Sequence, residues 1–156
     1  MLATLNKIQP VALLFLRVAV GIIMVVHGWW KIGHMEGFGQ FLAGLGFTQP
    51  SPQFHVYMAI ACEFLGGLGI LVGLLTRVAA LGIASAMSVA VFFVHWNNGL
   101  LMDNPATEAF ENGYEYPLTL LAVAVFLIFN GAGPLSLDAL ICKCKNKCHK
   151  EVSTEL

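Results

Sequence analysis

The sequence predicts an all-α membrane protein that folds as a bundle of four transmembrane helices. Hydrophobic residues make up 58% of the 156 residues and charged residues only 11%, whereas an ordinary soluble domain carries about 25% charged residues. The mean hydropathy is +0.77. The net charge of −1 lacks the basic excess of a nucleic-acid-binding protein. These values indicate a protein whose partner is the lipid bilayer.

Four apolar stretches reach or approach the roughly 20 residues that cross a bilayer as a helix. They cover residues 11–30, 56–75, 77–96 and 114–131, within a single membrane domain of residues 1–156. Their apolar runs are continuous and lack the alternation of a membrane β-strand. The first stretch ends in HGWWK and not in a small-residue cleavage site, which predicts an uncleaved helix. Thr76 alone separates the second and third stretches, which predicts a tight turn.

Lysine and arginine set the orientation of the spans, because cytoplasmic loops carry most of these residues. Lys7, Arg77 and the basic Cys/Lys tail at 142–156 fall on one side of the predicted spans. The connection after the third span carries acidic residues and neither Lys nor Arg. We therefore expect both termini in the cytoplasm and the acidic connection on the outer side, which in a bacterium is the periplasm or the cell exterior.

The first outward loop has a helical pattern of its own. Its apolar residues are Phe38, Phe41, Leu42 and Leu45, followed by Gly46, Pro50 and Pro52. This spacing predicts a short helix, either lying on the outer membrane interface or covering the bundle as a flap. A second short helix is predicted for 136–141.

Small residues predict how two spans pack. The second span has glycines at 66, 67, 69 and 73, and the third has Gly82, Ala86 and Ala90 at four-residue intervals. Small residues let helix backbones approach closely in lipid. We therefore expect a tight hairpin between these two spans. The alternative is that the glycine-rich stretch makes room for a flat ligand.

Ionisable side chains inside the predicted spans are the candidates for a functional site, because charge in a bilayer is costly and usually faces a partner. The candidates are Arg17, His27, Lys31, Glu63, His95 and Glu115. All except Arg17 fall in the outward half of the predicted bundle, which suggests a shared polar pocket. His34 and His55 lie in the predicted outward loop, where solvation is expected.

Two interpretations of this cluster remain open. In one, Arg17 and Glu63 form a buried pair that fixes the register of the helices. In the other, the groups transfer protons or bind a polar head group, since intramembrane Glu and His are typical of proton relays.

Metal and haem sites find little support in the sequence. The tail motif CKCKNKCH provides weak soft-metal candidates at Cys142, Cys144, Cys148 and His149. A basic tail lying on anionic lipid, or a lipid-modified tail, explains the same residues. His27 and His95 are at similar depth, but two histidines near an interface do not establish a haem site. We therefore predict neither a metal nor a haem.

Several motifs in a fixed order carry a resemblance to a known family. They are LFLRVAVGIIMVVHGWWKI, FLAGLGF, CEFLGGLGILVGLLTRVAAL, GYEYPLTLL and GAGPLSLD. Between Leu14 and Asp138 this set resembles the DoxX family of small four-helix bacterial membrane proteins. The polar residues that match the family pattern are Arg17, His27, Lys31, Glu63, Arg77, Glu115 and Asp138. The chain departs from the pattern at Leu135, where an aromatic residue is common, and in its Cys/Lys tail.

The resemblance implies a membrane subunit of a redox system, since related proteins are described in quinol oxidases and thiosulfate:quinone oxidoreductases. The leading hypothesis is a site for a quinone head group or a small sulfur substrate, with a redox protein or a second copy as partner. Glu63 and His27 would be catalytic and exchange protons. The expected substrate-binding residues are Arg17, Lys31, His95 and Glu115, and the expected structural polar residues are Arg77 and Asp138. The alternatives are a non-catalytic adaptor for a partner oxidoreductase and a carrier of small solutes or protons.

Overall fold

The computed structural model describes residues 2–101 and 113–144, and these residues form helices and turns without a β-strand. The all-α prediction is confirmed. The tail residues Cys148 and His149 lie outside the described part of the chain. The helices are α1 (Leu2–Gly33), α2 (Met35–Gly44), α3 (Pro52–Ile60), η1 (Ala61–Leu65), α4 (Gly66–Val72), α5 (Thr76–Val89), η2 (Ala90–His95), η3 (Trp96–Asn98), α6 (Glu115–Asn130) and a short helix at 137–144.

Three continuous helical segments of the described chain are long and apolar enough to cross a membrane. They cover Ile8–Gly33, Pro52–Val72 and Thr76–Asn98. The fourth predicted span corresponds to α6, a shorter apolar helix of 16 residues. The second segment begins at Pro52, four residues before the predicted start, because Ser51 caps it: its Oγ accepts a hydrogen bond from the backbone N–H of Phe54 at 3.2 Å.

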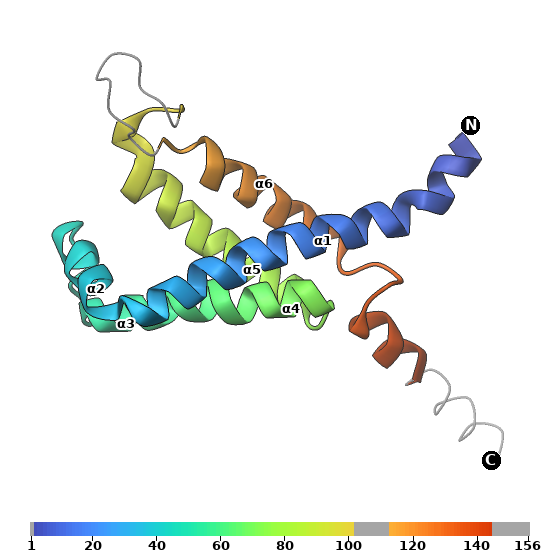
Figure 1. The fold of residues 1–156 in the computed structure, drawn as a ribbon, viewed down its shortest axis with the longest axis horizontal. Helices are drawn as coiled ribbons and strands as arrows, with labels where there is room; N and C mark the ends of the chain where they lie inside the picture. The colour runs from blue at the N-terminus through green and yellow to red at the C-terminus, as the bar shows by residue number, and fades with distance from the viewer. Residues whose placement is uncertain (1, 102–112, 145–156) are drawn as a thin grey trace.

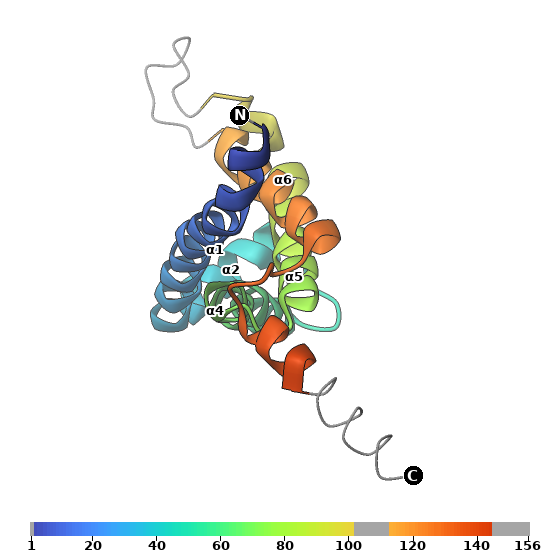
Figure 2. The same ribbon diagram turned by 90° about the vertical axis from the view of Figure 1, so that its right-hand side faces the viewer.

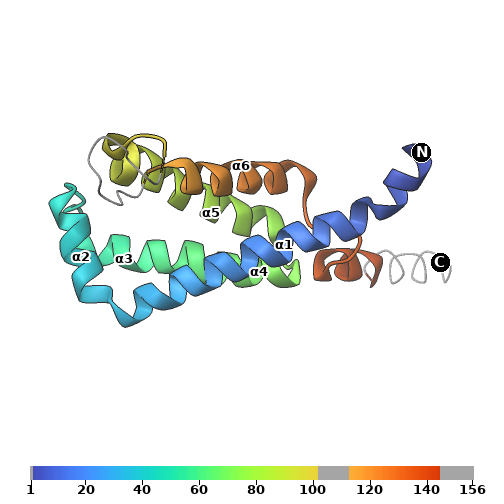
Figure 3. The same cartoon turned by 45° about the horizontal axis from the view of Figure 1, so that its top comes forward.

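The helices form two packed pairs that are joined at one end and separate at the other (Figures 1 and 3). Helix α1 lies along α4 and η1, while α5 lies along α6. Figure 2 shows α4 between α1 and α5, which both contact it. At the end where the pairs separate, α2 crosses from the end of α1 toward the start of α3 (Figure 3). The short helix that the sequence predicted in the first loop is therefore present.

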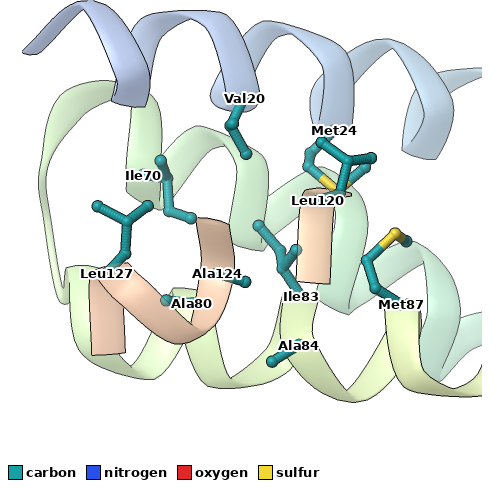
Figure 4. Close-up of a cluster of buried hydrophobic side chains, with 10 residues drawn as sticks. All are labelled: Val20, Met24, Ile70, Ala80, Ile83, Ala84, Met87, Leu120, Ala124 and Leu127. Carbon is teal, nitrogen blue, oxygen red and sulfur yellow. The ribbon is translucent and has the colours of Figure 1, made fainter. Parts of the chain in front are cut away.

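The hydrophobic core lies where the two pairs meet. Its ten buried side chains come from α1, α4, α5 and α6 (Figure 4). Ile70, Ile83 and Leu127 are wholly inaccessible. Met24, Met87 and Leu120 belong to the same cluster.

The glycines pack two interfaces, where the sequence analysis expected one. Gly66 contacts Ile83 and Ala79 of α5, which confirms the close hairpin. A Cβ added at Gly67 would instead lie 2.8 Å from the backbone nitrogen of Val25 in α1. Gly28 in α1 is equally close to η1, since an added Cβ would lie 2.6 Å from the nitrogen of Phe64. The small residues therefore hold α1 against the second segment as well, because both backbones approach without side chains between them.

The expected tight turn occupies residues 73–75, between α4 and α5. Gly73 has φ of +73° and Leu75 has φ of +48°, both in the left-handed region. Gly73 has a second reason to lack a side chain, since an added Cβ would overlap the guanidinium of Arg17.

Candidate functional site

A cavity of about 880 Å³ opens where the two helix pairs separate. It lies between the end of α1, the first turns of α6, and the facing parts of α3–η1 and α5–η2, with α2 along one side. Its walls are mainly apolar and aromatic, including Trp30, Phe38, Phe41 and Phe47. Polar groups reach it from several separate helices: His27, Lys31, His55, Glu63, His95 and Tyr116.

An ion pair between a buried carboxylate and a partly buried ammonium group lies on the cavity wall. The Lys31 ammonium group at the end of α1 donates to both carboxylate oxygens of Glu63 in η1. The Glu63 side chain is 5% exposed and that of Lys31 is 14% exposed. The Lys31 nitrogen also lies 4.9 Å from the centre of the Phe38 ring in α2. Lys31 therefore contacts both the Glu63 carboxylate and an aromatic side chain of α2, the helix of the first loop.

Correcting one interpretation of the sequence, Glu63 pairs with Lys31 and not with Arg17. The helical spacing placed Arg17 and Lys31 on one side of α1, but it did not determine which cation reaches the carboxylate. Lys31 lies in the same final stretch of α1 as Gly28, whose missing side chain brings α1 against η1 beside Glu63. Lys31 is therefore the partner of Glu63 because it lies at the same level along α1 as the contact with η1.

His27 and Tyr116 form a second polar contact at the cavity. The Tyr116 hydroxyl lies 3.4 Å from Nε2 of His27, and the two ring centres are 5.9 Å apart. Both residues are exposed at the opening. The sequence analysis did not include Tyr116 among the candidates, although its position beside the candidate Glu115 was a usable signal.

Two π-helical turns flank the cavity. η1 contains Glu63, and η2 ends at His95. π-helical turns within α-helices are rare and occur frequently at functional sites. Each turn changes which side chains face the cavity, and hydrophobic periodicity cannot predict that change.

Arg17 serves a different part of the structure. Its side chain is buried and donates to four backbone carbonyls: Ile70 at 3.0 Å, Leu71 at 3.3 Å, Ala132 at 2.8 Å and Leu135 at 2.8 Å. These carbonyls belong to the end of α4 and to the segment after α6, where helix geometry leaves them without partners. The structure therefore does not bring Arg17 to the cavity, where substrate binding was expected.

Asp138 and Arg77 complete this junction between helix ends. The Asp138 carboxylate accepts hydrogen bonds from the backbone N–H groups of Leu75 (2.8 Å) and Thr76 (3.0 Å), at the start of α5. Burial raises the pKa of Asp138, but these hydrogen bonds and the Arg17 charge outweigh it, so that the pKa lies below its ordinary value. Arg77 donates to the carbonyl of Phe129 near the end of α6 at 3.3 Å. The Asp138 carboxylate thus lies at the positive, N-terminal end of the α5 dipole, and the Arg77 guanidinium lies at the negative, C-terminal end of the α6 dipole.

The remaining candidates divide between the cavity and its surroundings. His95 lines the cavity, whereas Glu115 begins α6 outside the lining and its neighbour Tyr116 lines it. His34 is exposed, in agreement with the expected solvation. For His55 that expectation is wrong, because α3 begins early enough to place it in the cavity wall, partly buried. Cys62, which was not among the candidates, also lines the cavity.

Among the residues that the structure describes, no group of three His, Cys, Asp or Glu side chains is arranged to hold a metal ion. Cys142 and Cys144 are exposed free thiols on the short helix at 137–144. The other two candidates of the tail motif lie beyond that helix, outside the described part.

Comparison with known proteins decides the family. The family model described as DoxX matches residues 12–96, a segment that contains both members of the ion pair. The chain belongs to the DoxX family. This confirms the resemblance drawn from the motifs.

Three relatives of the chain are similar over most of its length. "Putative oxidoreductase CatD" of Bacillus subtilis (strain 168) is 32% identical over 141 residues, covering 90% of this chain and 95% of the relative. "Inner membrane protein YqjF" of Escherichia coli (strain K12) is 31% identical, covering 89% and 98%. "Inner membrane protein YphA" of the same strain is 28% identical, covering 83% and 90%. No solved structure matches the chain.

Proposed function

We propose that this DoxX protein is a membrane subunit of a quinone-linked redox system and that its cavity binds a quinone or quinol head group. The observation that carries the proposal is the Lys31–Glu63 ion pair on the wall of an aromatic cavity. A volume of about 880 Å³ lies within the range of small-molecule sites, which are mostly apolar with a few placed polar groups. The relative named as an oxidoreductase supports the redox assignment.

The charges of the cavity favour a neutral head group over a sulfur oxyanion. Glu63 already neutralises Lys31, and Arg17 is bound by carbonyls elsewhere. No other Lys or Arg belongs to the described cavity wall, and the sequence of 102–112 contains neither residue. A dianionic ligand would therefore lack a compensating cation, and burying uncompensated charge is costly.

Proton exchange is the chemistry that these side chains supply. Oxidation of a quinol to a quinone releases two electrons and two protons, and the reduction takes them up. In this proposal Glu63 and His27 exchange protons with the ligand, Lys31 holds the Glu63 carboxylate through the ion pair, and the Tyr116 hydroxyl donates to or accepts from a head-group oxygen. We assign the electrons to a partner redox protein.

The proposal includes four membrane crossings, with both termini in the cytoplasm of a bacterial inner membrane. At 1.5 Å per residue, the 16 residues of α6 extend about 24 Å, close to the roughly 30 Å hydrocarbon core. The start of α1 and the helix at 137–144 lie at the same end of the bundle (Figure 1), as an even number of crossings requires. Two relatives are named as inner membrane proteins.

Quinone content tests the proposal. We expect protein purified from its membrane in mild detergent to retain quinone, and Glu63→Gln to retain much less. Glu36→Gln makes the same chemical change at an exposed position of α2 outside the cavity lining and should match the wild type. Absence of quinone from all three proteins would contradict the proposal and favour the adaptor alternative. Movement of solute or protons through proteoliposomes would favour the carrier alternative.

A further inference from the structure

We propose that His55 is a hydrogen-bond acceptor for a hydroxyl group of the ligand, so that the cavity prefers the reduced, dihydroxy form of the head group. This inference rests on the proposed function and specifies which redox form the site binds more tightly. It concerns a residue that the sequence placed in a solvated loop.

His55 lines the cavity at a distance from the ion pair along the second helical segment. It lies in the first turn of α3, which Ser51 caps and Pro52 begins. Glu63 lies eight residues further along the same continuous helical segment, which corresponds to about 12 Å along the axis. Both side chains line the cavity, so a ligand that reaches both meets two polar groups separated along this segment.

The hydrogen bond on one ring nitrogen determines what the other nitrogen can do. Nδ1 of His55 lies 2.9 Å from the carbonyl oxygen of Ser51. A carbonyl oxygen only accepts hydrogen bonds, so Nδ1 carries the proton of the neutral ring and Nε2 presents a lone pair. Within residues 2–101 and 113–144, Nε2 makes no hydrogen bond.

Aromatic neighbours hold the His55 ring in this orientation. Phe47 contacts it edge-on with ring centres 5.3 Å apart, and Phe54 does so at 5.6 Å. Phe47 is itself fixed against Phe93, at 5.4 Å. The acceptor nitrogen is therefore oriented before any ligand enters.

An oriented acceptor discriminates between the two redox forms of a quinone. A hydroxyl group of the quinol donates a hydrogen bond to Nε2, whereas the carbonyl of the quinone has no proton to donate. Two acceptors facing each other, Nε2 and the quinone carbonyl, lower affinity in a mainly apolar site. We therefore expect the quinol to bind about tenfold more tightly than the quinone.

The test compares two stable probes, a short-chain benzoquinol and its dimethyl ether, which cannot donate. Equilibrium binding to the full chain in detergent gives the affinity ratio for each variant. Wild type should prefer the quinol about tenfold, and His55→Leu should lose most of this preference. His55→Gln, which keeps an acceptor near the position of Nε2, should restore part of it.

His34→Leu is the matched control. Nδ1 of His34 makes the same local contact, 2.9 Å from the carbonyl four residues earlier, but His34 is exposed and does not line the cavity. Its variant should keep the wild-type ratio. An unchanged ratio in His55→Leu would overturn the role of His55 alone. If wild type binds neither probe, the proposed function fails, and this inference fails with it.

Discussion

Lys31 at the end of α1 and Glu63 in η1 form a buried ion pair on the wall of the aromatic cavity. The pair joins two helical segments at the level where the bundle opens. Its position makes it a contact between two helical segments, and in the proposed function Glu63 also exchanges protons with the ligand.

The two charges should depend on each other for stability. Lys31→Met or Glu63→Gln alone leaves one charge buried without its partner, which typically costs about 3–5 kcal/mol. The double variant Lys31→Met/Glu63→Gln should be less destabilised than the sum of the two single variants. The measurement is a double-mutant cycle of unfolding free energies in detergent. Simple additivity would show that the two groups do not interact.

Close contact between α1 and η1 should depend on Gly28. An added Cβ would lie 2.6 Å from the Phe64 nitrogen, so Gly28→Ala must separate the two backbones and should cost about 1–3 kcal/mol. It should also weaken ligand binding, because Lys31 moves away from Glu63. Gly33→Ala is the control, since nothing lies within 4 Å of its added Cβ. Equal stability of the two variants, measured by thermal unfolding, would refute this packing.

Arg17 should be required for folding and not for the chemistry of the cavity. Its four carbonyl contacts join the end of α4 to the segment after α6. Arg17→Met leaves these carbonyls without a donor and should cost about 3 kcal/mol or more. Arg17→Lys should recover only part of this stability, because one ammonium group cannot reproduce the planar donor geometry. Quinol affinity per folded molecule should stay unchanged, and a large loss would place Arg17 in the ligand site.

Asp138 should make stability sensitive to acid. Its pKa in the folded protein lies below the ordinary value of 3.8, so its contribution is complete above the unfolded pKa and is lost as pH falls through the folded pKa. Asp138→Asn should lower stability by about 1 kcal/mol at neutral pH, as loss of a helix cap does. The difference from wild type should shrink below about pH 4. A difference that stays constant from pH 7 to pH 3 in unfolding measurements would contradict this role.

The sequence predicted the positions of the helices better than the contacts that their polar side chains make. Continuous apolar runs located the helical segments, because crossing a bilayer requires a fixed length of apolar chain. Helical spacing placed Arg17 and Lys31 on one side of α1, but their partners depend on contacts between distant segments. Asp138 caps α5 from 62 residues away in the sequence, a relationship that no local pattern contains.

The cavity was predicted in part for the same reason. Costly ionisable groups drew attention to His27, Lys31, Glu63 and His95, and all four line it. Tyr116 and Cys62 carry no comparable penalty in an apolar helix, so composition gave no signal for them. His55 was assigned to a loop because hydropathy does not detect the Ser51 cap as the start of the second segment.

Photolabelling with an azido-quinone probe tests the central claim, that the cavity holds the head group, most directly. After illumination of the protein in native membranes, mass spectrometry should find labels in residues 27–42 and 55–63, and excess quinol should suppress them. Glu63→Gln should reduce this labelling and Glu36→Gln should not. Labels confined to outward-facing apolar residues such as Val78, Leu81 and Phe129, insensitive to excess quinol, would contradict the account.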